Sequence, residues 1–537
     1  MSRFLLLFLF LIWMAWRAES GGASVLRAAD LGMFFGLYLF IVGTLGIWSR
    51  LLARRVRRAS LERGMRYFNR VAFAARTFVP IWFAVGVFQL GWGDAVQRLL
   101  GPLRDWPVQM PGALIGVMPP ILAWIGLWWS QFPADRALRE QTMLVRLDND
   151  LPIFRPPTFW SYLAANLRLQ VLFTAVPILL ILFVHDVVMI VLWRGFGVTT
   201  GQSAAEGIIT FASAIAVFIV VPEILTRVLP TQSLPPSPLR QRMEAMCTAH
   251  GMKFRDILIW RTQNRLANAL VMGVAPRFRY VLLSDLLLTE MTDEQIEAVF
   301  AHELGHVVHR HMIWYLVFMK ILILALAVIA LVLEAQQGWL RLPRWMPPDL
   351  VMTLIGFGGF LLAFGFISRR FERQADVFAA RTIQRLEGSG LFIAHANPHA
   401  NPDHANLDDP TTAVTATGLA KTPSTSIVRP PPSHVGPLGA AIFSSALERV
   451  AVINNMPLGP RGRWEGGLSR RLGFVMELIG DAANNWLHGS ISHRMRALRH
   501  MSSDPAQTHR FDRRMARLYV TLVVALLVSA TLAWVVR

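Results

Sequence analysis

The sequence predicts a multi-pass α-helical membrane protein that carries a folded α+β domain on one face of the bilayer. Three observations predict this fold class. The 537-residue chain is 54% hydrophobic and only 16% charged, whereas soluble domains carry about 25% charged residues. Apolar runs long enough to cross a bilayer recur along the chain. Its 53 Lys and Arg against 34 Asp and Glu give a net charge of +19, and the basic residues gather in alternate loops.

The composition also excludes other classes of protein. A chain this apolar is not disordered throughout, and because Cys247 is its only cysteine, it is not a disulfide scaffold. A nucleic-acid-binding domain is disfavoured at this hydrophobicity, although the charge alone would suggest one. We therefore expect a lipid bilayer as a partner and no nucleic acid, and the sequence leaves the oligomeric state open.

Eight apolar runs approach or exceed the roughly 20 residues that a membrane helix needs. They are 31–49, 77–92, 109–131, 169–193, 204–225, 312–334, 349–367 and 518–536. A ninth run, 4–16, is short and also has the shape of a signal peptide; of the two, we favour an uncleaved first span. The sequence therefore predicts about eight or nine spans.

Lys and Arg counts orient the loops between these runs. Loops 50–76, 132–168, 226–311 and 368–517 are rich in arginine, whereas loops 17–30, 93–108, 194–203 and 335–348 hold few basic residues. Rich and poor loops alternate strictly, and the basic side of a membrane protein is cytoplasmic. We expect a bacterial inner membrane with the long basic loops in the cytoplasm; an endoplasmic reticulum membrane is the alternative.

The loop lengths divide the chain into segments. Residues 1–225 form an N-terminal membrane domain of about six spans, and 518–537 form a C-terminal span. Between them, 226–311 and 368–517 are long enough to fold, and a transmembrane hairpin, 312–367, separates them. Within the second part, 387–438 is polar, rich in proline and aperiodic, which predicts a disordered insertion or mobile lid. Its three histidines (His395, His399 and His404) are expected to be solvated.

Residues 292–309, TDEQIEAVFAHELGHVVH, are predicted to form a helix. Thr292 and Gln295 can form a capping box, and acidic residues fill the first turn. Apolar residues recur at Ile296 and Val299 with helical spacing. The histidines near the end of this segment therefore lie on a helix.

The sequence HELGH at 302–306 has the HExxH pattern of metallopeptidases. His302 and His306 project from one helical face about 40° apart, so both imidazoles can bind one Zn²⁺. Glu303 is rotated about 100° from His302 and can reach a water at the metal. A carboxylate base can take the proton of a zinc-activated water as it attacks a peptide carbonyl. The alternative is a His-rich helix end near the membrane surface.

A catalytic zinc site needs a third protein ligand, and we expect Glu372 to provide it. Glu372 lies in SRRFERQAD, 368–376, directly after the run that ends the hairpin. The HExxH helix meets the first hairpin span within about 9 Å, so the hairpin returns Glu372 to the same interface. Asp376, one turn beyond, can orient a ligand histidine. The alternative for Glu372 is an ion pair with Arg369 or Arg373.

The order HELGH, two membrane spans, SRRFERQAD resembles the integral-membrane zinc metallopeptidases of the HtpX and CAAX prenyl protease type, the Ste-type gluzincins. The resemblance covers about 235–500 apart from the insertion. It implies a cytoplasmic zincin-type α+β domain with one Zn²⁺ per chain. It also implies that His302, His306 and Glu372 bind the zinc and that Glu303 is the base.

Two further matches to this family are less specific. Asn268 and Ala269 resemble the family's edge strand, which pairs with an extended substrate. HGSISHRM, 488–495, is similar to the family's C-terminal His-Pro-Pro segment, although glycine and serine replace the prolines. His488 would then donate to the oxyanion, and Arg494 would either stabilise the same charge or hold a carboxylate. His309, on the zinc-facing side of the helix, is expected to support the site.

These features predict a zinc endopeptidase acting on unfolded or membrane-associated polypeptides, most simply in membrane-protein quality control. One alternative is a CAAX-type processing protease for a specific lipidated substrate. Another is a non-enzymatic scaffold or transporter that retains a zincin domain. His185, Asp186 and Glu223 lie in apolar runs, where they either line a hydrated chamber or form structural pairs.

Overall fold

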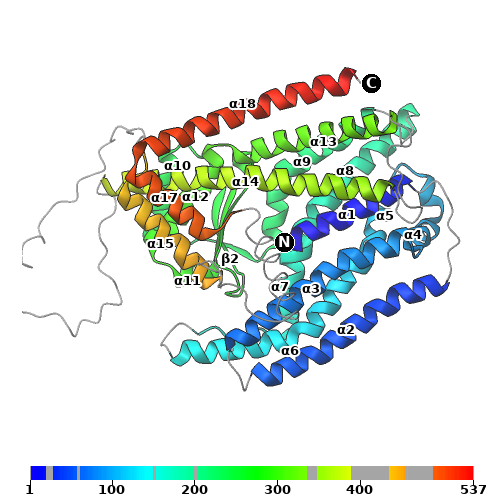
Figure 1. Cartoon of the computed structure of the whole chain (residues 1–537), viewed down its shortest axis with the longest axis horizontal. Helices are drawn as coiled ribbons and strands as arrows, with labels where there is room; N and C mark the ends of the chain where they lie inside the picture. The colour runs from blue at the N-terminus through cyan, green and yellow to red at the C-terminus, as the bar shows by residue number, and fades with distance from the viewer. Residues whose placement is uncertain are drawn as a thin grey trace, which may run out of the picture.

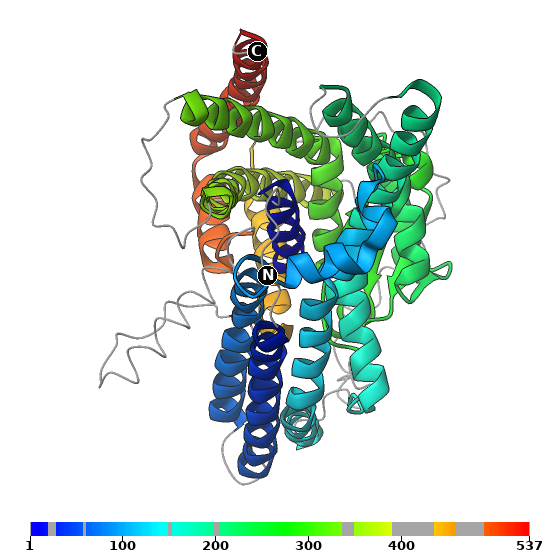
Figure 2. The same cartoon turned by 90° about the vertical axis from the view of Figure 1, so that its right-hand side faces the viewer.

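Helices account for most of the described chain, and a small sheet lies at one end of them (Figure 1). The structure is a computed structural model that describes residues 2–19, 28–56, 61–148, 153–197, 204–335, 348–388, 434–454, 456 and 488–535. A view turned by 90° shows the N-terminal helices α2, α3 and α6 extending below the rest of the molecule (Figure 2). The expected insertion, 387–438, falls mostly outside the described residues: α14 continues to Gly388 and α15 begins at Pro437.

The first 228 residues contain only helices in the described ranges. The α-helices are α1 (Ser2–Glu19), α2 (Ala28–Val56), α3 (Leu61–Phe88), α4 (Trp92–Leu100), α5 (Met110–Gly116), α6 (Met118–Asp148), α7 (Phe159–Asn166), α8 (Phe173–Phe196) and α9 (Ala204–Val228). A 3₁₀ turn, Gly101–Asp105, follows α4, and a π-helical segment, Leu167–Leu172, joins α7 to α8.

Helix α1, the expected short ninth span, is packed among its neighbours. Leu6, Leu9, Ile12 and Trp13 are each 0% exposed. The indole of Trp13 lies where a Cβ on Gly116 would be, so α1 and α5 approach closely only because that position is glycine.

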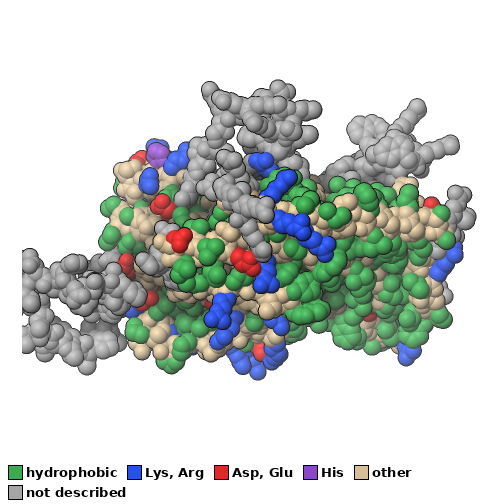
Figure 3. All heavy atoms as spheres, turned by 90° about the horizontal axis from the view of Figure 1, so that it is seen from below, with side chains coloured by type: hydrophobic (Ala, Val, Ile, Leu, Met, Phe, Trp, Pro, Cys, Tyr) green, Lys and Arg blue, Asp and Glu red, His purple; other side chains and the backbone are tan. Residues whose placement is uncertain are grey.

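Six described helical segments are long and apolar enough to cross a membrane. They are Ala28–Val56, Tyr67–Phe88, Met110–Asp148, Phe159–Phe196, Ile208–Val228 and Pro505–Leu532. A seventh is counted if α12 and the start of α13, which are bent by 50°, form one span. The expected count of eight or nine also included 4–16, which is a shorter apolar helix, and 349–367, which lies in α14 but has side chains that are described only in part. Hydrophobic side chains cover much of one face of the molecule (Figure 3).

The ionisable residues inside the apolar helices have protein partners. Both Asp186 oxygens accept a backbone N–H at 2.8 Å, from Gln109 and Met110, and so bind the start of α5. Glu223 contacts Arg227 at 2.9 Å and accepts the hydroxyl hydrogen of Tyr280. These contacts favour structural pairs over a hydrated chamber.

A four-stranded sheet follows the N-terminal helices, in the order β1-β2-β4-β3. The strands are β1 (Thr231–Ser233), β2 (Asp256–Trp260), β3 (Ala269–Met272) and β4 (Tyr280–Ser284). β2 and β4 are parallel, and the outer pairs are antiparallel. Strand β3 therefore lies at an edge, with Val271 facing Val281 of β4.

The remaining helices pack with this sheet around one core. They are α10 (Pro238–Ala249), α11 (Asp285–Glu290), α12 (Asp293–Val308), α13 (His311–Ala335), α14 (Pro348–Gly388), α15 (Pro437–Ile453), α17 (Ile491–Ser503) and α18 (Pro505–Val535). The core joins Met243 of α10, Phe300 of α12, Phe371 of α14, Phe443 of α15 and Leu522 of α18. The C-terminal helix is thus part of the unit that contains the HExxH helix.

Candidate metal centre

Helix α12 forms as its sequence predicts and presents two histidines on one face. The Thr292–Gln295 capping box is complete at its start. The Nε2 atoms of His302 and His306 lie 3.3 Å apart. At Gly305, between the two histidines, an added Cβ would lie 3.1 Å from the Ala375 Cα. Glycine therefore lets α12 and α14 approach closely at the level of the histidines.

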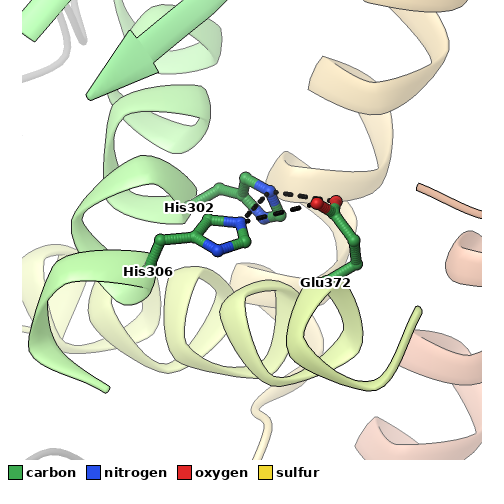
Figure 4. Close-up of side chains that lie close together, drawn as sticks. All are labelled: His302, His306 and Glu372. Atoms are coloured by element: carbon green, nitrogen blue, oxygen red, sulfur yellow. Dashed lines mark hydrogen bonds and ion pairs between the residues drawn. The ribbon is translucent and has the colours of Figure 1, made fainter. Parts of the chain in front are cut away.

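Glu372 of α14 meets both imidazoles (Figure 4). Its Oε2 lies 3.5 Å from His302 Nε2, and its Oε1 lies 3.7 Å from His306 Nε2. The three side chains offer one ligand atom each within 4.8 Å of one another. The expected hairpin geometry is therefore present: Glu372 faces the two imidazoles, and His488 Nδ1 lies 2.8 Å from its Oε1, which favours the ligand role over the ion-pair alternative.

The three side chains converge as a zinc site requires. Ligands at about 2.0–2.1 Å from zinc in tetrahedral geometry stand about 3.3–3.4 Å from one another. The two imidazole Nε2 atoms are 3.3 Å apart, and each has one oxygen of the Glu372 carboxylate nearby, Oε2 at 3.5 Å from His302 and Oε1 at 3.7 Å from His306. Glu372 Oε2 is buried and has no hydrogen-bond partner among the described residues. Burial opposes ionisation, but His488 and His302 hold the pKa of Glu372 well below its usual range. Two imidazoles and one carboxylate are a donor set that zinc prefers.

Asp376 and Arg494 lie directly behind these residues. Asp376 Oδ1 is 3.0 Å from His302 Nδ1, on the side of the ring away from His306. Arg494 donates to both Asp376 oxygens, at 2.9 and 2.5 Å, and its Nη1 lies 3.5 Å from Glu372. Asp376 is 1% exposed. Of the two roles expected for Arg494, this geometry supports holding a carboxylate.

Glu303 and His488 also reach the centre. Burial raises the pKa of Glu303 to about 7, and its carboxylate is bonded to the backbone of Val271 on β3. The exposed His488 side chain contacts Glu372, with its Nδ1 2.8 Å from Oε1. His488 thus comes to the site from a segment far away in the sequence, as the family resemblance implied.

The predicted edge strand lies beside the HExxH helix. Ala269 begins β3, and Asn268 precedes it with its side chain exposed. The side-chain amide of Asn454, at the end of α15, exchanges two hydrogen bonds with the backbone of Ala267, at 3.0 and 2.8 Å. Asn454 therefore fixes the chain where it enters β3.

His309 lies at the end of α12, away from the ligand atoms. Its Nδ1 accepts a hydrogen bond from the Gln374 amide at 3.3 Å. The neighbouring His311 has the closer contact with a predicted ligand, since its Nδ1 lies 2.9 Å from His306 Nδ1. No local sequence pattern predicts this contact, because it depends on the bend between α12 and α13.

Comparison with known protein families finds a match for the segment that contains this centre. Residues 234–456 match the sequence model of peptidase family M48. We refer to this matching segment as the M48 domain. The M48 domain, together with the apolar helices, makes the chain a membrane zinc metalloendopeptidase. Peptides are the substrates of such an enzyme, and the chain is an integral membrane protein.

Other comparisons are more distant. None of the curated proteins compared with the chain matches it. Among solved structures, the crystal structure of Ste24p from S. mikatae is similar at a TM-score of 0.36 and 14% identity. That similarity covers 65% of this chain and 88% of the other. The M48 domain ends before His488, Arg494 and α18, so these contribute to the centre from outside the matched segment.

Sequence reasoning missed several residues at the centre. Phe443 of α15 stacks on the His302 ring, with centroids 5.7 Å apart. Gly305, Asn454 and His311 were also missed. Only Gly305 carried a local signal, because a glycine inside a helix costs about 1 kcal/mol and calls for a packing reason.

Proposed function

We propose that the chain binds one Zn²⁺ through His302, His306 and Glu372 and uses it to hydrolyse peptide bonds. The observation that carries this proposal is the convergence of three ligand side chains: the two imidazole Nε2 atoms lie 3.3 Å apart, and one Glu372 oxygen lies 3.5 or 3.7 Å from each. Three protein ligands leave a fourth position open, as catalytic zinc sites require. A bound zinc ion supplies Lewis-acid activation of water and of the peptide carbonyl.

Glu303 is the proposed general base. It lies next to His302 in sequence, yet its carboxylate turns toward the backbone of Val271 rather than joining the ligand atoms. Burial raises its pKa to about 7, and a base is most effective when its pKa lies near the working pH. Glu303 therefore takes a proton from the attacking water and returns it to the leaving amine.

Strand β3 is the proposed binding edge for the substrate. Ser284 of β4 donates its backbone N–H to Asn268 at 3.0 Å, so these two residues form a hydrogen-bonded pair. Because pairing alternates along an antiparallel ladder, the backbone groups of Ala269 and Val271 face the free side. An extended peptide paired there would pass between β3 and α12, beside Glu303.

The remaining residues orient these groups. Asp376 holds the Nδ1 side of His302, and Arg494 holds Asp376. His488, beside Glu372, is the proposed donor to the oxyanion. His309 supports the end of α12 through Gln374.

We propose the same domain organisation that the sequence suggests. Residues 1–225 form the N-terminal membrane domain, 226–311 and 368–517 form the catalytic domain around the hairpin 312–367, and 518–537 form the C-terminal span. Arginine-rich loops place the centre on the cytoplasmic face, in a bacterial inner membrane. Membrane-protein quality control is the proposed role, since pairing to a strand edge accepts any extended polypeptide.

Zinc analysis of the purified full chain tests the ligand set. We expect one zinc per chain in the natural protein and none in His302→Ala after dialysis against a weak chelator. His509→Ala is the control, since it removes an exposed imidazole of α18 that is not one of the three proposed ligands. Equal zinc in His302→Ala and the natural protein would overturn the assignment.

A further inference from the structure

His311 is a buried imidazole that links a proposed zinc ligand to the rest of the fold. It is 0% exposed, and its ring stacks on Phe371 with centroids 4.3 Å apart and planes 3° apart. Its Nδ1 lies 2.9 Å from His306 Nδ1, and its Nε2 lies 3.0 Å from Gln374 Oε1. Both ring nitrogens are therefore engaged, one by a ligand histidine and the other by a neutral amide.

A bend in the backbone brings His311 to this position. Helices α12 and α13 meet at 50°, and Arg310 between them has φ 55°. Left-handed backbone is unfavourable for a residue other than glycine, and such strain persists only where the surrounding structure fixes it. The bend turns His311 back toward His306 instead of letting the helix run straight on.

The hydrogen bonds of Gln374 determine which atoms donate and which accept between Tyr519 and His306. Its amide nitrogen donates to His309, so its Oε1 is the acceptor. Oε1 accepts from His311 Nε2 and, at 2.5 Å, from the hydroxyl of Tyr519. His311 Nδ1 is then a lone-pair acceptor and receives the Nδ1 proton of His306. This leaves the Nε2 lone pair of His306 facing the other two ligand atoms.

Reversing the donors and acceptors in these hydrogen bonds is incompatible with metal binding. If the Gln374 amide were reversed, His311 would accept at Nε2 and donate from Nδ1. His306 would then carry its proton on Nε2, the atom that faces His302 and Glu372. A protonated nitrogen cannot bind zinc, so only the first arrangement fits a metal site.

Tyr519, the last residue in this series of hydrogen bonds, belongs to α18, outside the M48 domain. Its ring packs on Trp314 of α13, with centroids 4.5 Å apart, and on Phe371 at 6.0 Å. The C-terminal helix therefore reaches within two hydrogen bonds of His311.

We propose that His311, Gln374 and Tyr519 are positioning residues that hold His306 in the tautomer that binds zinc and connect the C-terminal span to the metal centre. This inference rests on the proposed ligand set. Asp376 does the same for His302 with a charged group. His306 is held instead by a series of hydrogen bonds between uncharged side chains, and the last of these, Tyr519, lies on the C-terminal helix α18.

The test measures zinc affinity of the full chain in detergent by competition with a chelator, together with the melting temperature of the zinc-free protein. His311→Phe keeps a ring to stack on Phe371 but removes both nitrogens. We expect it to bind zinc about 10–100-fold more weakly, the usual loss when such a partner is removed. Tyr519→Phe should weaken binding in the same direction but less. His311→Asn, which restores an acceptor oxygen, should recover part of the affinity.

Tyr315→Phe is the matched control. Tyr315 donates to Ser368 and packs on Phe371, so it shares the surroundings of His311 without contacting a ligand. We expect unchanged zinc affinity in this variant, whatever its melting temperature. If His311→Phe binds zinc as tightly as the natural protein does, the inference is wrong. Absence of zinc from the natural protein would instead overturn the proposed function.

A second, independent feature is an arginine-lined cavity between α14, α17 and α18, with a volume of about 340 Å³. Its lining contains four arginines and two histidines and no carboxylate: Arg373, Arg496, Arg510, Arg514, His493 and His500. Burial and the charges of Arg373 and Arg496 lower the pKa of His493.

This cavity has positive charge without an acidic partner. Asp512, on the same helix as two of the arginines, is bound to Arg381 at 2.7 Å. Within the described ranges, Arg496, Arg510 and Arg514 make no ion pair. Converging charges of one sign attract an anion, and the arginine fork matches phosphate geometry.

The cavity lies where the helices enter the apolar segments. Arg514 precedes the apolar run of α18 by one turn, and Arg373 follows the apolar run of α14. Anionic headgroups gather at that level of a bilayer. We infer that the cavity binds the phosphate-bearing headgroup of an anionic phospholipid.

Melting of the full chain in detergent tests this site with three probes: short-chain phosphatidylglycerol, short-chain phosphatidylcholine and inorganic phosphate. We expect a saturable rise with phosphatidylglycerol that is lost in Arg510→Gln/Arg514→Gln. The charge-matched control Arg513→Gln/Arg517→Gln should keep the rise, since neither residue lines the cavity. An equal rise with phosphatidylcholine, a rise with inorganic phosphate alone, or a full rise in the first double variant would overturn the inference.

Discussion

The close approach of α12 and α14 at Gly305 should set both the stability of the domain and its affinity for zinc. A Cβ at this position would lie 3.1 Å from the backbone of Ala375 and 3.1 Å from the ring of Phe378. Carbon atoms normally pack at about 3.5–4.0 Å. Gly305→Ala would therefore push the helices apart by about 0.4 Å, the difference between 3.5 and 3.1 Å.

Two opposing effects determine the stability of Gly305→Ala. Overpacking costs about 1–3 kcal/mol, whereas alanine gains about 1 kcal/mol over glycine inside a helix. The zinc-free protein should thus lose between zero and about 2 kcal/mol. Zinc affinity should be more sensitive to this change than stability is, because His302 and His306 lie on α12 and Glu372 lies on α14.

The separations that join these helices are 3.5 Å from Glu372 Oε2 to His302 Nε2 and 3.7 Å from Glu372 Oε1 to His306 Nε2, both longer than the 3.3 Å between the two imidazoles. Metal sites tolerate changes of about 0.2 Å in ligand distance, so a further 0.4 Å should weaken zinc binding about tenfold or more, about 1.4 kcal/mol.

Chelator competition and thermal melting measure the two effects of Gly305→Ala separately. Gly359→Ala is the matched control on α14, because its Cβ would meet no described atom within 4 Å. This control should bind zinc as the natural protein does. If Gly305→Ala binds zinc with natural affinity, the reasoning that helix spacing sets the site is wrong.

Three further predictions concern the residues around the centre. Arg494→Leu removes the guanidinium that pairs with the buried carboxylate of Asp376 and should destabilise the zinc-free protein by about 3–5 kcal/mol in a melting experiment; a loss below 1 kcal/mol would contradict the buried pair. Asn454→Ala removes two hydrogen bonds that fix the start of β3, so KM for an extended peptide should rise more than kcat falls, whereas a fall in kcat alone would argue against the edge strand. Removal of metal with a chelator should abolish peptide hydrolysis, and Zn²⁺ should restore it where Mg²⁺ does not, because Mg²⁺ prefers six oxygen ligands; activity that survives chelation would contradict a metal mechanism.

Local patterns in the sequence were enough to predict the central geometry. The HExxH helix follows from spacing and capping within 18 residues, and Glu372 follows from the length of the hairpin that returns the chain. The family resemblance at Asn268 and Ala269 predicted an edge strand, and β3, which begins at Ala269, lies at an edge of the sheet. The polar residues in the apolar helices were left open, because their partners at Gln109 and Tyr280 are remote in sequence.

The rest of the site depends on long-range packing that no local pattern encodes. His311 reaches His306 only through the bend at Arg310, and Tyr519 reaches Gln374 only because α18 packs along α13. Arg494 had two expected roles, and its contact with Asp376, 118 residues away, decides between them. The span count depends on α12 and the start of α13, because these two helices form a bent pair that is counted as a span only if they are taken together.

The measurement that tests the central claim most directly compares the natural chain with Glu303→Gln on an unfolded membrane-protein substrate, with zinc content measured on the same samples. We predict one zinc per chain in both proteins and a rate at least about 10²-fold lower in Glu303→Gln, since a positioned base contributes about 10²–10⁴-fold. Glu294→Gln, an exposed carboxylate in the first turn of the same helix, should cleave at the natural rate. Cleavage by Glu303→Gln at the natural rate would contradict the mechanism.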